Sequence, residues 1–246
     1  MTRRSLLLSA LAAPALGAAA KVSERTVTPE KVFTAPGGRH PNGLQAVAEG
    51  LWILDQSDNK AYLTGFDGKL KRTLETDADR GSGIGFDGKN LWIASTYNRK
   101  TLEVDPQTGK TLRSFETPGA GVVAFAKNPN QPATGAHGIE FHGGKMWIAV
   151  PPAVKIYRID PADNHVEHEI PAPGERPHGI SFQGDSLWCT ESNHMAFYKL
   201  DPQTGAWNEK IRLAEGSATP HGMSIWKGWM WYSDADGGGG VYRIQL

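Results

Sequence analysis

A His-Gly dipeptide followed by Ile or Met occurs three times, in the segments "AHGIEF", "PHGISF" and "PHGMSI". Its histidines are His137, His178 and His221. A carboxylate follows two of them at the same distance, Glu191 after His178 and Asp234 after His221. Imidazoles and carboxylates together bind divalent cations, and a neutral imidazole also serves as a general base. The spacing therefore indicates metal-binding or acid–base chemistry, provided that the fold brings these side chains to one place.

These segments belong to a longer repeat that is aligned by a tryptophan in each copy. The tryptophans are separated by 40, 55, 41 and 43 residues and are Trp52, Trp92, Trp147, Trp188 and Trp231. Each copy contains a strand after the glycine, a tight glycine turn, the tryptophan strand, a third strand and a turn such as "DPQTG" before a fourth strand. A period of roughly 40–45 residues with four short strands predicts the blades of a β-propeller.

The last copy stops after its third strand, "GVYRIQL", whereas residues 29–38, "PEKVFTAPGG", match the fourth strand of the other copies. We therefore predict an all-β fold, a five-bladed β-propeller closed by the N-terminal strand, with residues 29–36 pairing beside residues 241–246. Closure removes two exposed strand edges. The 55-residue interval leaves about a dozen extra residues, too few for another blade. These residues, 120–135, are expected on the histidine-bearing face, either as a substrate lid or as a variable loop without function.

Residues 1–20, "MTRRSLLLSALAAPALGAAA", have the charged start, apolar run and small-residue end of an export signal. Arg3 and Arg4 indicate a twin-arginine signal, with an ordinary secretory signal as the alternative. We expect residues 21–246 to form one periplasmic or secreted propeller domain, monomeric and without a membrane span once the signal is removed. Basic and acidic residues balance at 26 each, which gives no electrostatic case for a nucleic-acid partner. A small-molecule substrate is the expected partner.

Stacking the repeats produces two rings of residues that should share one face of the propeller. The residue before the first glycine of each copy is Asn42, Ser82, His137, His178 or His221. The residue three past each tryptophan is Asp55, Ser95, Val150, Glu191 or Asp234. The histidines either form a functional cluster or are repeat consensus residues, each bonded to a neighbouring backbone. Asn42 and Ser82 favour the first interpretation, because a purely architectural requirement would apply to every blade.

The segments "PHGI", "LWCTE" and "YKLDPQTG" resemble streptogramin B lyases, also called virginiamycin B lyases, and the resemblance runs through all five repeats. It implies catalytic roles for His137, His178 and Glu191, a further role for His194 three residues on, and a magnesium ion, with Zn²⁺ and Mn²⁺ as alternatives. The lyases have seven blades, so their antibiotic substrate does not carry over to a five-bladed chain. The glutamate-centred pattern of plant-type glutaminyl cyclases, which are also five-bladed, is not found. The carboxylate-and-asparagine metal site of gluconolactonase-type lactonases is matched poorly.

The resulting hypothesis is an exported, metal-dependent carbon–oxygen lyase that opens an ester or lactone by β-elimination. His178 is the predicted general base, and Glu191 either binds the metal or orients the imidazole. The predicted metal ligands are Glu191, His221 and Asp234, and the predicted substrate-binding residues are His194, Asn42, Tyr97 and Asp55. The alternative is a non-catalytic propeller that binds a ligand, a metal or a protein on the same face.

Overall fold

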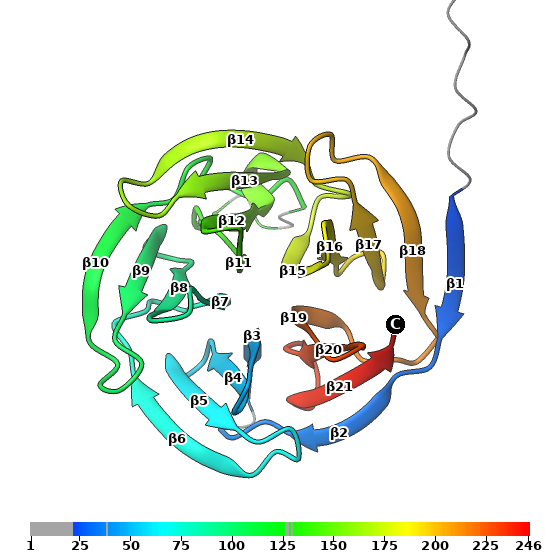
Figure 1. Ribbon diagram of the computed structural model, residues 1–246, viewed down its shortest axis with the longest axis horizontal. Coiled ribbons are helices and arrows are strands. Elements are labelled where there is room, and N and C mark those ends of the chain that lie inside the picture. The colour runs from blue at the N-terminus through cyan, green and yellow to red at the C-terminus, as the bar shows by residue number, and fades with distance from the viewer. Residues whose placement is uncertain (1–21, 38, 126–127, 129) are drawn as a thin grey trace, which may run out of the picture.

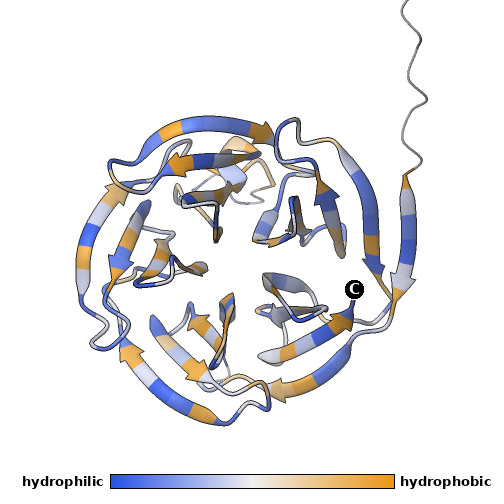
Figure 2. Ribbon diagram, in the orientation of Figure 1, coloured by the Kyte–Doolittle hydropathy of each residue, from blue (hydrophilic) through white to orange (hydrophobic). Residues whose placement is uncertain are grey.

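The computed structural model describes residues 22–37, 39–125, 128 and 130–246, so the predicted export signal lies outside the described residues. Within these ranges the strands form five blades arranged in a ring (Figure 1), and all strand pairs are antiparallel except that of β1 with β18. No helix in the described residues is long and apolar enough to cross a membrane. Figure 2 shows hydrophilic and hydrophobic residues alternating along the outer strands, as expected for strands with one solvent-facing side.

The first three blades follow the order of the chain from the inside of the ring to the outside. Blade 1 consists of β3 (Pro41–Val47), β4 (Gly50–Asp55), β5 (Lys60–Thr64) and β6 (Leu70–Glu75). Blade 2 consists of β7 (Gly83–Phe86), β8 (Leu91–Ser95), β9 (Lys100–Val104) and β10 (Thr111–Glu116). Blade 3 consists of β11 (Gly138–His142), β12 (Lys145–Val150), β13 (Lys155–Asp160) and β14 (His165–Pro171), with a 3₁₀ turn at Pro151–Ala153.

The last two blades also take strands from the N-terminal part of the chain. Blade 4 consists of β15 (Pro177–Gln183), β16 (Ser186–Glu191), β17 (Ala196–Leu200), β18 (Trp207–Leu213) and, outermost, β1 (Ser23–Val27). Blade 5 consists of β19 (Pro220–Trp226), β20 (Trp229–Asp234), β21 (Gly240–Gln245) and β2 (Glu30–Thr34).

The predicted closure of the ring is confirmed. Strand β2 pairs antiparallel with β21, from Glu30 opposite Arg243 to Thr34 opposite Gly240. The strand also reaches blade 1, because the ring of Phe33 packs so closely on Gly68 that a Cβ there would lie 2.5 Å from it. The first and last parts of the propeller are therefore joined both by backbone hydrogen bonds and by side-chain packing.

Strand β1 was not expected from the sequence. It lies parallel to β18 as a fifth strand on the outside of blade 4 (Figure 1). Its segment, "SERTV", is short and polar, and the carboxylate of Glu24 lies 3.6 Å from Lys210 and 3.2 Å from Arg212 of β18. The chain passes this edge on its way to blade 5, which places β1 beside β18 with no signal from the repeat.

The glycine of each repeat allows the five inner strands to approach one another. A Cβ on Gly138 would lie 2.1 Å from the carbonyl oxygen of His178, and one on Gly179 would lie 2.1 Å from the amide nitrogen of Met223. These distances are far inside van der Waals contact, so only glycine fits. The space between the inner strands is only about 10 Å³ at this level.

Each repeat tryptophan fills the interface with the following blade. Trp147 of blade 3, for example, packs in one apolar cluster with Ile180 and Leu187 of blade 4. Trp188 packs with Met223 of blade 5 in the next cluster, and all five repeat tryptophans are at most 3% exposed. Burying a tryptophan removes a large apolar area from water, so these five contacts stabilise the blade interfaces.

Two truncations separate the roles of the N-terminal strands. Removing residues 1–28 deletes β1 and returns blade 4 to the four-stranded form of its neighbours, so we expect a soluble monomer with a small decrease in melting temperature. Removing residues 1–36 also deletes β2 and exposes the edge of β21, so we expect aggregation. Size-exclusion chromatography and thermal unfolding of the two proteins test this. A soluble second truncation with the melting temperature of the first would contradict the role of β2.

Candidate functional site at the channel mouth

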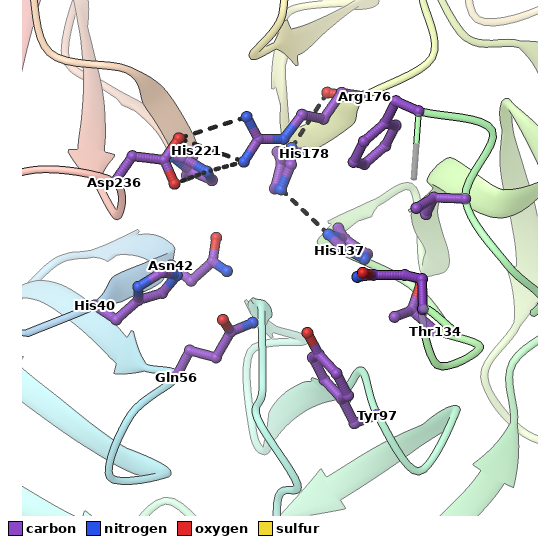
Figure 3. Close-up of a pocket in the computed structure, with 13 residues that line it drawn as sticks. His40, Asn42, Gln56, Tyr97, Thr134, His137, Arg176, His178, His221 and Asp236 are labelled. Atoms are coloured by element: carbon purple, nitrogen blue, oxygen red, sulfur yellow. Dashed lines mark hydrogen bonds and ion pairs between the residues drawn. The ribbon is translucent and has the colours of Figure 1, made fainter. Parts of the chain in front are cut away.

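A cavity of about 200 Å³ lies at one mouth of the channel and receives residues from all five blades (Figure 3). Its lining residues are His40, Asn42 and Gln56 of blade 1, Tyr97 of blade 2, His137 of blade 3, Arg176 and His178 of blade 4, His221 and Asp236 of blade 5, and Val123, Phe125, Gln131 and Thr134 of the 120–135 segment. These four residues of the segment therefore lie at the histidine-bearing face.

The structure brings the three repeat histidines together. The ring centroids of His137 and His178 are 4.8 Å apart, and those of His178 and His221 are 4.6 Å apart, both in edge-to-face geometry. Each histidine comes immediately before a repeat glycine, where the inner strands are closest. The proximity of the three rings therefore follows from the narrow channel.

The hydrogen bonds of His178 determine which of its nitrogens carries the proton. Its Nδ1 lies 3.2 Å from the carbonyl oxygen of Arg176 and 3.1 Å from the hydroxyl of Ser192. That hydroxyl donates its own hydrogen to the carbonyl of Pro220 at 2.6 Å. The Arg176 carbonyl and the Ser192 hydroxyl are therefore both hydrogen-bond acceptors for Nδ1. We assign the proton of His178 to Nδ1 and a lone pair to Nε2.

The tautomer of His178 determines the tautomer of His137. Its Nδ1 lies 3.2 Å from His178 Nε2 and must donate to that lone pair. In the neutral imidazole, Nε2 of His137 then carries a lone pair. Nε2 is buried, and no described residue is its hydrogen-bond partner. A buried acceptor without a partner is costly in a protein that has no further use for it.

His221 has the same tautomer and a charged neighbour. Its Nδ1 lies 3.3 Å from the carbonyl oxygen of Thr219, and its Nε2 accepts from the guanidinium of Arg176 at 3.0 Å. Both Nη atoms of Arg176 also lie 3.4 Å from the carboxylate of Asp236. His221, Arg176 and Asp236 thus form a polar cluster on one side of the cavity (Figure 3).

Burial keeps the three repeat histidines neutral. It lowers the pKa of His137 to about 3, with smaller contributions from His221 and the charge of Arg176. It lowers the pKa of His221 to about 4, although the carboxylate of Asp236 acts in the opposite direction. The pKa of His178 is lowered well below its usual value, again mainly by burial. The imidazoles at the channel mouth are therefore uncharged at neutral pH.

The acidic residues of the second ring lie elsewhere than the sequence suggested. Glu191 is fully buried, and its two oxygens accept from the backbone amides of Arg176 and His194, both at 2.7 Å. Asp234 accepts from the amides of residues 236–238, and Asp55 accepts from the amides of His40 and Ser57. These carboxylates connect loops to the ends of the second strands, and none of them lines the cavity.

The remaining predicted residues divide between two places. Asn42 and Tyr97 line the cavity, and the side-chain oxygen of Asn42 is buried with no partner among the described residues. His194 lies away from the other histidines, with its Nδ1 2.9 Å from the hydroxyl of Tyr198. It lines a separate hollow of about 420 Å³, which also contains Lys210 and Arg212.

Sequence reasoning missed Arg176 and Asp236. Arg176 stands three residues before a repeat glycine, at a position that the other copies fill with His40, Arg80, Gly135 and Thr219. Asp236 stands five residues past a repeat tryptophan, which is the register position of Tyr97. The histidines were selected because the residue type at their repeat position varies between copies. The residue types at the positions of Arg176 and Asp236 vary in the same way.

The lining residues do not fit a magnesium ion. Mg²⁺ requires oxygen ligands in near-octahedral geometry and is usually held through one or two carboxylates, whereas Asp236 is the only carboxylate among the described residues that line this cavity. Glu191 and Asp234 use their oxygens for backbone amides, and Asp236 pairs with Arg176. In the part of the chain that the structure describes, no three His, Cys, Asp or Glu side chains are grouped to hold a metal ion. Metal binding stays a prediction from the resemblance.

The low pKa of His221 predicts a pH dependence of stability. As the pH falls below 6.5, the imidazole in the unfolded chain takes up a proton and the buried one does not until about pH 4. The free energy of unfolding should therefore be constant above pH 6.5 and decrease below it by about 1.4 kcal/mol per pH unit for this residue. Urea unfolding at pH 7 and pH 5 should show a loss about 2 kcal/mol smaller in His221→Gln than in the wild type. An equal loss in both proteins would contradict the neutral, buried state.

Comparison with known proteins supports the fold. No protein-family model and no curated protein matches the sequence. Among solved structures, glutaminyl cyclase from Myxococcus xanthus has a TM-score of 0.70 and 10% identity, covering 92% of this chain and 98% of the cyclase. A catalytically inactive virginiamycin B lyase from Staphylococcus aureus with quinupristin has a TM-score of 0.52 and 21% identity, covering 84% of this chain.

A further streptogramin B lyase structure has a TM-score of 0.53 and 19% identity and covers 89% of this chain. This chain spans 66% and 70% of the two lyase chains, which are therefore longer. At these identities the likeness concerns the fold. The chain is a five-bladed β-propeller whose fold resembles those of streptogramin B lyases and of glutaminyl cyclase.

Proposed function

We propose that the channel-mouth cavity binds a small ester or lactone and opens it by β-elimination, in a protein that is exported to the periplasm or beyond. The observation that carries the proposal is the His137–His178 pair, in which a hydrogen bond of 3.2 Å leaves the Nε2 lone pair of His137 without a partner among the described residues. A base oriented by a second group is a common arrangement for proton abstraction.

The reaction needs a substrate with a C–H bond next to a carbonyl and an ester oxygen on the neighbouring carbon. His137 Nε2 takes the proton, the electron pair of the C–H bond forms the carbon–carbon double bond, and the C–O bond breaks to release a carboxylate. His178 holds the His137 ring by accepting from its Nδ1. The hydrogen bonds thus favour His137 as the base and His178 as its positioning residue. The sequence had instead predicted His178 as the base, with Glu191 as a metal ligand or as the group that orients the imidazole.

Substitutions test these two roles. His137→Ala removes the proton acceptor and should lower kcat by roughly 10²–10⁴-fold on any ester or lactone that the wild type eliminates. His178→Asn removes the acceptor for His137 Nδ1 and should lower kcat by a smaller factor. His165→Ala, at an exposed histidine at the start of β14, is the control and should have wild-type kinetics. Full activity of His137→Ala in a correctly folded protein would refute the assignment.

The pH–rate profile provides a second test. The base must be unprotonated to act, and burial lowers the pKa of His137 to about 3. The rate should therefore stay constant from pH 8 to about pH 5 and decline only at more acidic pH. An acidic limb centred near 6.5 would mean that the catalytic imidazole is solvated, contrary to the burial of His137.

Chelation distinguishes the proposed chemistry from the metal-dependent mechanism implied by the resemblance. Because Asp236, the one carboxylate among the described lining residues, pairs with Arg176, elimination by the protein dialysed against EDTA should proceed at the original rate. The control is the same protein supplied with Mg²⁺ in excess. Loss of activity in EDTA and recovery on addition of Mg²⁺ would favour the metal-dependent mechanism.

One observation favours the alternative, a propeller that binds a ligand without transforming it. A base acts best when its pKa lies near the working pH, and the pKa of His137 is about 3. The same buried imidazoles would serve as fixed, neutral acceptors in a binding site. A ligand that binds in the cavity and is recovered unchanged, together with no elimination from any ester or lactone tested, would establish this alternative.

A further inference from the structure

Arg176 lines the cavity and has no role in the mechanism above. Its backbone is held on both sides, because its amide donates to Glu191 Oε1 at 2.7 Å and its carbonyl oxygen accepts from His178 at 3.2 Å. Since Glu191 is fully buried, water does not compete for its bond to the Arg176 amide. The guanidinium is thereby directed into the cavity in a preorganised position (Figure 3).

The guanidinium is only partly satisfied by its neighbours. It has five N–H donors, and its described contacts are one bond of 3.0 Å to His221 and two of 3.4 Å to one oxygen of Asp236. Charge-assisted bonds between arginine and a carboxylate are normally near 2.7–2.9 Å. The side chain of Asp236 is 41% exposed, so this pair is long and partly screened by water.

The surroundings of Arg176 indicate what else would approach it. The ring centroid of Phe125 lies 5.7 Å from the guanidinium carbon, and the buried Val123 lines the same cavity. The adjacent His178 and His221 are neutral, because burial lowers the pKa of both. The cavity thus places one cation beside an apolar wall, an arrangement that matches an organic anion with an apolar body.

We propose that Arg176 binds the carboxylate that leaves in the elimination, and that Val123 and Phe125 pack against the apolar body of this leaving group. When the C–O bond breaks, its electron pair goes to the departing oxygen and the charge spreads over two carboxylate oxygens. A guanidinium fork matches two such oxygens in a planar, bidentate contact. Asp236, which is exposed, turns away to admit them. This inference rests on the proposed function, since elimination from an ester is what generates the carboxylate.

The proposed substrates are therefore esters of carboxylic acids with an aromatic or branched apolar body, and benzoate is a simple probe of the leaving-group site. Isothermal titration calorimetry at pH 7 and low ionic strength should show that benzoate binds the wild type more tightly than acetate does. Benzamide, which has nearly the same shape and no charge, should bind at least about tenfold more weakly than benzoate.

Variants identify the residue responsible. Arg176→Met should weaken benzoate binding by about 10- to 100-fold. Arg176→Lys keeps the charge but not the planar guanidinium, so its affinity for benzoate should lie between those of Arg176→Met and the wild type. Asp236→Asn removes the competing carboxylate and should strengthen binding. Arg212→Met removes a cation from the separate hollow of about 420 Å³ and should change nothing. Benzamide binding equal to benzoate binding, or loss of binding in Arg212→Met alone, would overturn the inference.

The results of these experiments show whether the role of Arg176, the proposed elimination or both are wrong. If an ester is eliminated and benzoate neither binds nor inhibits, the elimination stands and the role of Arg176 is wrong. If benzoate binds through Arg176 and no ester or lactone reacts, the carboxylate site stands and the elimination is wrong. Competitive inhibition by benzoate, lost in Arg176→Met together with a reduced kcat, supports both.

Discussion

The close approach of the five inner strands is the constraint on which the rest of the structure depends. A Cβ on Gly138 or Gly179 would meet the backbone of the next blade at 2.1 Å, so the ring closes at this radius only with glycine. Any side chain placed just before these glycines is forced into the channel mouth with its counterparts. The three histidine rings are in contact for this reason, with no need for a metal or a ligand to gather them.

Because the three histidine rings pack together away from water, their protein neighbours determine their tautomers and their charge. Buried imidazoles must be hydrogen-bonded, and among the described residues the acceptors near Nδ1 of His178 are the carbonyl of Arg176 and the Ser192 hydroxyl. The direction of these bonds runs from His137 through His178 to Ser192 and the carbonyl of Pro220. Each bond sets the tautomer of the next residue, which makes His137 Nε2 the acceptor that faces no described partner. The neutral state of the cluster has the same origin, because charging an imidazole here would bury a cation beside Arg176.

The carboxylates of the second ring show how the same scaffold uses acidic side chains. At the end of a second strand the chain turns, and the amides of the turn need acceptors. Glu191 and Asp55 supply them to Arg176 and His40 respectively, in equivalent positions of two blades. Their role is thus to hold the loops that carry the cavity residues. Glu191 affects the site through the position of Arg176 and does not contact the cavity itself.

Much of the fold is determined by the sequence alone, because the repeat carries local and periodic signals. The five tryptophans, the glycine turns and the unfinished last copy specify the blade number, the strand order and the closure by residues 30–34. They also specify that the residues before the repeat glycines share one face. Strand β1 was not predicted because its pairing with β18 depends on the path of the chain and on ion pairs between the two strands, which no repeat encodes.

Only the tertiary structure decided which polar residues face the cavity and in which protonation state. Glu191 and His178 are neighbours along a hairpin, yet one turns toward backbone amides and the other toward His137, a difference that sequence spacing does not contain. Arg176 and Asp236 come from different blades and meet at the cavity wall. Val123, Phe125, Gln131 and Thr134 reach the same cavity. Burial, which lowers the pKa values of the histidines, is a property of the assembled ring. The sequence determined where the site lies, and the packing of five blades determined what it contains.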